Sequence, residues 1–188
     1  MTKNKVPGSI AVWVATLVNA SGKSVAYGRF RSKRLQERVR RELGRLGESA
    51  IQELSRIIHG AWEEESCSAY EAQAAAAEIL AIAEAGQVLR EALHASLARA
   101  TSTQETLLRR SLVHAIGDLG QKGAAATAEV RALLRAEDYG VRQAALVALD
   151  KICTDARKVD AAIAAALDDR DPRVQAVAQM LQRTREKS

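Results

Sequence analysis

Apolar positions in the C-terminal half of the chain follow a pattern that repeats every 33 residues. Between residues 138 and 152, one helical face carries apolar side chains at Val141, Ala145, Ala148, Leu149 and Ile152. Residues of the same character stand one period earlier at Leu108, Leu112, Ala115, Ile116 and Leu119, and one period later at Val174, Ala178 and Leu181. Such a fixed period is typical of a helical solenoid, in which each unit buries its apolar face by stacking on its neighbours. The sequence therefore predicts an α-solenoid.

The same spacing extends toward the N-terminus and divides most of the chain into helix pairs. Leu35, Val39, Leu43 and Leu46 repeat the spacing of the C-terminal units. The expected helices lie at about 32–45, 50–58, 72–83, 88–97, 104–119, 125–136, 138–153, 157–168 and 172–185. The last helix has no partner and its outer positions are polar, as the end of a stack requires. These elements predict about four and a half helix pairs.

Residues 10–30 differ from everything that follows. The run from Ile10 to Val18 is apolar and rich in β-branched residues, residues 19–24 have turn chemistry, and residues 25–30 could form a return strand. We predict a β-hairpin-like arm over residues 1–30, followed by the solenoid over residues 31–188. The alternative is that Ile10–Val18 forms a short helix capping the stack, because apolar runs of this length fit either state.

The repeat motif itself has a family likeness. Residues 138–149 read Asp-x-x-Val-Arg-x-x-Ala-x-x-Ala-Leu, and Asp-x-x-Val returns at 171–174, where Pro172 follows a capping Asp171. This pattern resembles the HEAT repeat, in particular the short bacterial type related to the repeats of bilin lyases. The match covers residues 104–181 well, 32–58 acceptably and 67–100 poorly. The resemblance implies an armadillo-like α-solenoid with partner-binding surfaces and leaves the specific role open.

Composition adds a strong charge asymmetry. The whole chain carries a formal charge of +5, but residues 1–46 hold eleven basic side chains against two acidic ones, which gives +9. The remaining residues hold 17 basic and 21 acidic groups, which gives −4. Aromatic residues make up only 3% of the chain, and the two cysteines lie far apart in sequence. We therefore expect the basic character to be local to the N-terminal end. The two separated cysteines favour a reducing cytoplasm as the natural setting.

Four arginines on the helix predicted at 32–45 carry the sharpest candidate site. At 100° per residue, Arg34, Arg38, Arg41 and Arg45 fall along one side of this helix, with Arg31 close to the same line. The stripe is roughly 20 Å long at the rise of an α-helix. The sequence leaves two interpretations about equally open: a solvated face, or a site for carboxylates or phosphates, which the planar guanidinium suits.

The arm supplies aromatic side chains next to this stripe. We predict that the partner- or phosphate-binding surface comprises Arg31, Arg34, Arg38, Arg41, Arg45, Trp13, Tyr27 and Phe30. Its partner would be a protein with an acidic surface or, as the alternative, a nucleic acid. Lys3 and Lys5 before the run Ile10–Val18 resemble the start of a signal peptide only weakly, since Pro7-Gly8 interrupts the pattern, and the run is too short to span a bilayer.

Familiar catalytic patterns are missing from the sequence. His59, His94 and His114 are isolated, no paired-cysteine or His-Glu-x-x-His spacing suits a metal, and Ser21-Gly-Lys-Ser24 lacks the first glycine of a phosphate loop. The second helix of each pair carries charged residues of both signs, Glu129 among them. These helices do not encode the basic, aromatic-lined groove of HEAT-like DNA glycosylases. Nor is there a chromophore-handling signature of the kind that bilin lyases would imply.

These observations lead to one prediction about function. We expect a non-catalytic interaction scaffold or adaptor in a cytoplasmic, bacterial assembly, without cofactor, metal or membrane contact, and with a basic N-terminal binding surface. Nucleic-acid binding through the arm and the arginines is the alternative from another class, and a lyase-type or glycosylase-type enzyme comes third.

Overall fold

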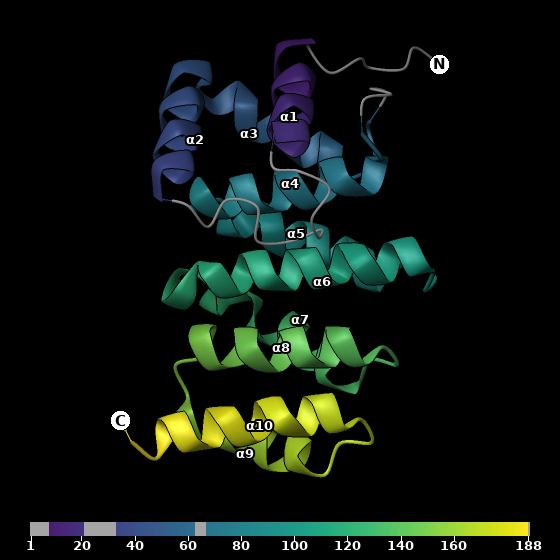
Figure 1. The fold of residues 1–188 in the computed structure, drawn as a ribbon, viewed down its shortest axis with the longest axis vertical. Helices are drawn as coiled ribbons and strands as arrows, with labels where there is room; N and C mark the ends of the chain where they lie inside the picture. The colour runs from purple at the N-terminus through teal and green to yellow at the C-terminus, as the bar shows by residue number, and fades with distance from the viewer. Residues whose placement is uncertain (1–7, 21–32, 63–66, 188) are drawn as a thin grey trace.

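The computed structural model describes residues 8–20, 33–62 and 67–187, and the secondary structure within these ranges is helical throughout (Figure 1). The prediction of a β-hairpin-like arm is wrong for its first half, because Ile10–Val18 lies within helix α1 (Gly8–Ala20). The return strand expected at residues 25–30 falls outside the described residues, as does the predicted domain boundary at 30/31. The helical alternative therefore describes residues 10–18.

The remaining helices follow the predicted spans closely, apart from one that is broken. They are α2 (Lys33–Leu46), α3 (Glu48–Ile58), α4 (Ala69–Ile82), α5 (Gly86–Leu97), α6 (Thr103–Asp118), α7 (Thr127–Ala132), α8 (Tyr139–Ile152), α9 (Ala156–Leu167) and α10 (Pro172–Arg185). The helix expected at 125–136 is divided, since α7 lies between two 3₁₀ segments, η1 (Gly120–Ala126) and η2 (Leu133–Arg135).

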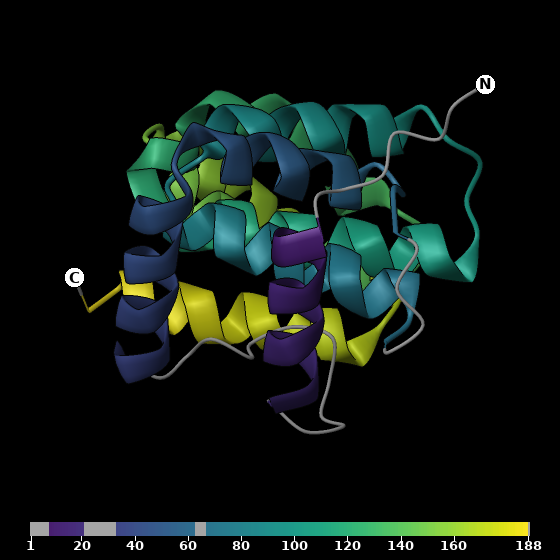
Figure 2. The ribbon, with the colours of Figure 1, turned by 90° about the horizontal axis from the view of Figure 1, so that it is seen from above.

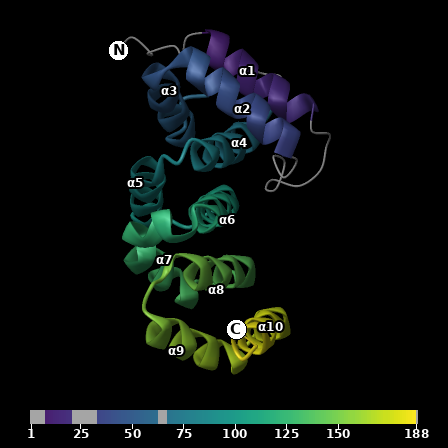
Figure 3. The same ribbon diagram turned by 90° about the vertical axis from the view of Figure 1, so that its left-hand side faces the viewer.

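The helices form two rows, as a solenoid requires. In Figure 3, α4, α6, α8 and α10 follow one another along one side of the molecule, and α5, α7 and α9 along the other. The largest contacts join α6 to α8 and α4 to α6, so the first row forms the spine of the stack. One hydrophobic core runs from α1 to α8, and a smaller one joins α8 to α9 and α10. The predicted α-solenoid is thus confirmed.

The N-terminal helices lie across the end of this stack rather than adding another layer (Figures 1 and 2). Helix α1 packs on α4, and its residues Ile10, Val14, Leu17 and Val18 are all buried. Helix α2 makes smaller contacts with α3 and α4, and Val39 is its buried residue. The end of α2 is a sharp stop at Gly47, whose φ of 70° is a left-handed conformation that favours glycine.

Local chemistry fixes the ends and the spacing of the stacked helices. Asp138 caps α8 by accepting a hydrogen bond from the Val141 amide at 2.8 Å. Helices α6 and α8 approach closely at Gly117, where an added Cβ would lie 3.1 Å from the Cβ of Ala148. Ala145, at one of the repeated apolar positions, is also fully buried.

Candidate partner-binding surfaces

Helix α2 presents the arginines that the sequence singled out. Its apolar side chains, such as Leu35 and Val39, face the core, and this orientation turns the opposite side to solvent. Arg34, Arg38, Arg41 and Arg45 are all exposed, and we call them the α2 arginine stripe. The structure therefore brings four of the predicted site residues together on one helix.

Among the described residues, most of these guanidinium groups make no contact that holds the fold together. Arg45 donates to Glu42 at 3.0 Å, within α2 itself. Arg34, Arg38 and Arg41 have no ion-pair partner among the described residues. Exposed ion pairs contribute about 0–1 kcal/mol, so even the Arg45 contact adds little to stability. Within the described part of the chain, the one ion pair of the stripe is thus the contact of Arg45 with Glu42.

The aromatic members of the predicted surface do not all join the stripe. Trp13, on α1, is half-buried and packs against the core, and its indole nitrogen is buried without an acceptor among the described residues. Tyr27, Phe30 and Arg31 lie outside the described residues. The described part of the predicted surface therefore consists of the α2 arginine stripe, with Trp13 serving at least in part as a packing residue.

The row formed by α5, α7 and α9 contains a small hollow that the sequence analysis did not predict. It lies between α5 and α7, has a volume of about 410 Å³, and is lined by residues that include Arg90, His94 and Glu129. The Arg90 Nε donates to Glu129 Oε1 at 2.8 Å. Burial raises the pKa of Glu129, but the Arg90 hydrogen bond and the charges of Arg90 and His94 outweigh it and lower the pKa below its ordinary value. Glu129 is therefore ionised at neutral pH.

A larger groove lies on the other side of α7. It runs between α7–η2 and α9, with a volume of about 610 Å³, and alanines and basic side chains dominate its lining. The sequence contained a signal for this groove in the alanine-rich run of α9. In a repeat protein, however, alanine is equally typical of closely packed helices, so the pattern alone did not identify an open groove.

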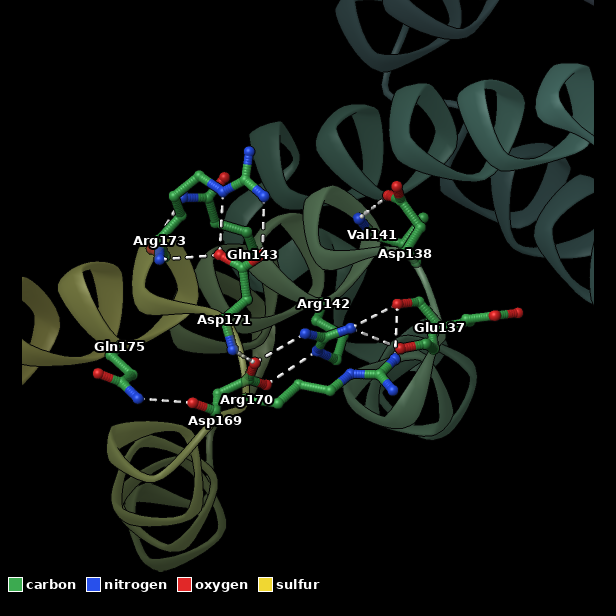
Figure 4. A network of polar contacts seen from close by, with 11 residues as sticks. Glu137, Asp138, Val141, Arg142, Gln143, Asp169, Arg170, Asp171, Arg173 and Gln175 are labelled. Carbon is green, nitrogen blue, oxygen red and sulfur yellow. Dashed lines mark hydrogen bonds and ion pairs between the residues drawn. The ribbon is translucent and has the colours of Figure 1, made fainter.

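A buried polar network fixes the loops beside this groove (Figure 4). Arg142 on α8 donates to both carboxylate oxygens of Asp169, at 2.8 and 2.7 Å, and to the carbonyls of Ala136 and Glu137. The Arg142 hydrogen bond lowers the pKa of Asp169. Nearby, the hydrogen bond from Arg173 lowers the pKa of Asp171 to about 2. This network ties α8 to the α9–α10 loop, and Arg142 and Asp169 both line the groove.

Comparison with known families identifies the repeat. Residues 93–182 match the family model described as HEAT repeats. Residues 93–182 are HEAT repeats. The matched HEAT segment begins within α5 and ends within α10, and it covers both the groove and the Arg142 network. No curated protein is similar enough to the chain to match it.

One solved structure resembles the whole HEAT-repeat fold of this chain. It is the complex of CpcE and CpcF of phycocyanin lyase from Nostoc sp. PCC7120, with a TM-score of 0.56 and 18% sequence identity. The similarity covers 91% of this chain and 98% of that chain. At this identity the likeness concerns the fold, and it extends beyond the HEAT match into the N-terminal helices.

This comparison corrects the prediction that the chain is not an enzyme. The prediction rested on the lack of familiar catalytic patterns, yet the same fold occurs in a chain of a phycocyanin lyase complex. A HEAT-repeat fold without a standard motif therefore does not exclude a part in catalysis. Among the described residues, no helix combines the length and the apolar character needed to cross a membrane.

Proposed function

We propose that this HEAT-repeat chain is a protein-interaction subunit that works in an assembly with a second protein. The observation that carries the proposal is the shared fold: 91% of this chain resembles a chain from a complex of two proteins. HEAT repeats over residues 93–182 support the same role, since stacked repeats expose long surfaces for partners. The cytoplasmic setting expected from the sequence remains part of this proposal.

The α2 arginine stripe is the surface that we assign to this partner. Its four guanidinium groups are exposed, and three of them have no ion-pair partner in the described part of the chain. Guanidinium groups bind carboxylates with two parallel hydrogen bonds, and arginines are frequent among the residues that dominate interface energies. A partner with an acidic surface therefore fits the stripe, and nucleic acid is the competing occupant.

Affinity purification of the tagged chain from its native host, with and without nuclease, tests this function. We expect one protein to co-purify in a fixed ratio and to survive nuclease treatment. Changing Arg34, Arg38, Arg41 and Arg45 together to glutamate, the α2 charge-reversal variant, should abolish this co-purification. A control variant that reverses Arg157, Arg183 and Lys187 at the other end of the stack should retain the partner.

Two results would contradict the proposal. If only nucleic acid co-purifies, with an affinity that falls steeply as salt rises, the stripe binds phosphates. If the charge-reversal variant retains its protein partner in full, the stripe is a solvated face and the binding surface lies elsewhere. Circular dichroism should show unchanged helical content in both variants, because arginine and glutamate are both good helix formers.

A catalytic contribution within such an assembly is the second candidate function. It is favoured by the hollow between α5 and α7, where the ionised carboxylate of Glu129 lies beside His94. Paired titratable groups in a hollow are suited to proton transfer. The test is lyase activity on phycocyanin with the co-purified partner present: loss of activity in His94→Ala with the partner still bound would support catalysis, and unchanged activity would exclude this hollow.

A further inference from the structure

The groove between α7–η2 and α9 has an apolar floor. Leu134, Leu146 and Val174 line it from η2, α8 and α10, and alanines of α7 and α9 form its sides. Leu146 and Val174 are buried, while Ala161 and Ala165 are exposed. Small side chains on the walls allow another chain to approach the floor closely, so apolar side chains of about leucine size would find a complementary surface there.

Uncompensated positive charge borders this floor. Arg131 and Arg135 line one side, one helical turn apart, and both are exposed and without an ion-pair partner among the described residues. Lys158 stands on the α9 side and makes a surface contact of 3.2 Å with Asp155. Among the described residues that line the groove, the one carboxylate is Asp169, and Arg142 engages both of its oxygens.

We propose that this groove binds an amphipathic α-helix of a partner protein, with an apolar stripe on the floor and glutamates or aspartates facing Arg131 and Arg135. This inference rests on the proposed interaction function and adds a second surface to it. The spacing of the two arginines matches carboxylates four residues apart on a helix, which lie on one face. The apolar floor adds hydrophobic burial that a purely electrostatic contact would lack.

The lining favours a protein helix over nucleic acid. No aromatic side chain is among the described residues that line the groove, so bases would find no stacking surface. The floor of the groove also presents carbon atoms, which cannot donate hydrogen bonds to phosphate groups. A helix with adjoining apolar and acidic stripes can place the first on the floor and the second against the basic side chains.

Fluorescence anisotropy with a designed peptide tests the proposal. The probe is a fluorescein-labelled amphipathic helix of about 18 residues, or five turns, with leucine and alanine on one stripe and glutamate at successive turns beside it. A second peptide replaces each glutamate by lysine, and a labelled single-stranded DNA of about 20 nucleotides serves as the nucleic-acid probe. We expect the acidic peptide to bind the full chain and the lysine peptide to bind at least tenfold more weakly.

Groove variants and a matched control locate the binding. Arg131→Glu with Arg135→Glu should weaken acidic-peptide binding at least tenfold, and Ala165→Trp should do the same by filling the groove. Arg183→Glu with Lys187→Glu changes the same number of charges at the same spacing outside the groove, and it should leave binding unchanged. Equal loss in this control would overturn the proposal, because the peptide would then be responding to net charge.

Other outcomes also overturn the proposal. Absence of acidic-peptide binding at about 1 mM would show that the groove does not take such a helix. DNA binding that the groove variant abolishes, without peptide binding, would assign the groove to nucleic acid. The α2 charge-reversal variant separates this inference from the proposed function: it should bind the peptide normally while losing the co-purified partner. Peptide binding can therefore fail with the partner retained, and the partner can be lost with peptide binding intact.

Discussion

Replacing Arg142 by methionine should destabilise the C-terminal part of the stack. The Arg142 side chain is 5% exposed and the Asp169 side chain 12% exposed. Methionine is close to the stem of arginine in length and keeps the packing on α8, but it removes the donors to Asp169, Ala136 and Glu137. The variant therefore leaves a nearly buried carboxylate without its countercharge.

The size of the effect follows from that unpaired charge. Removing one partner of a buried ion pair typically costs about 3–5 kcal/mol, because the remaining ion stays desolvated. Changing both residues, Arg142→Met with Asp169→Leu, removes the unpaired charge as well, and such replacements are often neutral or stabilising. We therefore expect the double variant to regain most of the stability that Arg142→Met loses.

Urea denaturation followed by two signals measures this loss and its location. Trp13 and Trp62 are the two tryptophans of the chain, and both precede the HEAT segment. In a stack held together by neighbouring units, damage at α8–α10 should unfold the C-terminal repeats first. The circular dichroism midpoint of Arg142→Met should then fall by about 1.5–2.5 M urea, taking about 2 kcal/mol per M as the slope. Tryptophan fluorescence should change at higher urea than circular dichroism.

Two results would contradict this expectation. A midpoint within about 0.3 M of the parent protein would mean that the pair contributes less than about 1 kcal/mol. A double variant as unstable as Arg142→Met would show that the lost contacts to the carbonyls, rather than the unpaired Asp169, account for the cost.

Further predictions concern packing and pH. Ala145→Glu buries a charge at a position that is 0% exposed and should cost several kcal/mol; a change in melting temperature below about 2 °C would contradict this burial. Gly117→Val should cost about 1–3 kcal/mol, since an added Cβ would lie only 3.1 Å from that of Ala148, and a neutral result in thermal melts would refute the close approach. The folded pKa of Asp169 lies below its ordinary value of 3.8, so its contribution is present above pH 3.8 and lost as pH falls toward the folded pKa. Urea midpoints should therefore drop between pH 5 and about pH 3, and less steeply in Asp169→Asn; equal slopes would contradict the assignment.

The repeat made most of the fold predictable. Stacked units demand the same small and apolar positions at each period, so Val141, Ala145 and their equivalents revealed the helices directly. The repeat pattern does not show where a helix departs from α-helical geometry. The helix expected at 125–136 overlaps two 3₁₀ segments for this reason.

The N-terminal error has a physical cause. The β-branched residues of Ile10–Val18 favour strands by intrinsic propensity, but their positions also fit a helix. Ile10, Val14 and Leu17 are buried, whereas Val12, at 52% exposure, and Thr16 face solvent. This is the period of an amphipathic helix, and packing on α4 decides in its favour over local propensity.

The candidate surfaces were predictable only where they lie on one helix. The α2 arginine stripe follows from spacing along a single element, as does its exposure. The hollow near Glu129 and the groove near Arg131 each join residues from different helices, such as Arg90 and Glu129, which are 39 residues apart. Their geometry depends on how the repeats stack, which the sequence pattern does not specify.

Binding of a protein partner through α2 is the proposal on which the assigned function depends. Isothermal titration calorimetry of the purified partner against the parent chain and the α2 charge-reversal variant is its decisive test. We predict saturable binding at a fixed ratio by the parent chain and at least tenfold weaker binding by the folded variant, a loss of about 1.4 kcal/mol or more. Equal affinities for the two proteins would contradict the proposal.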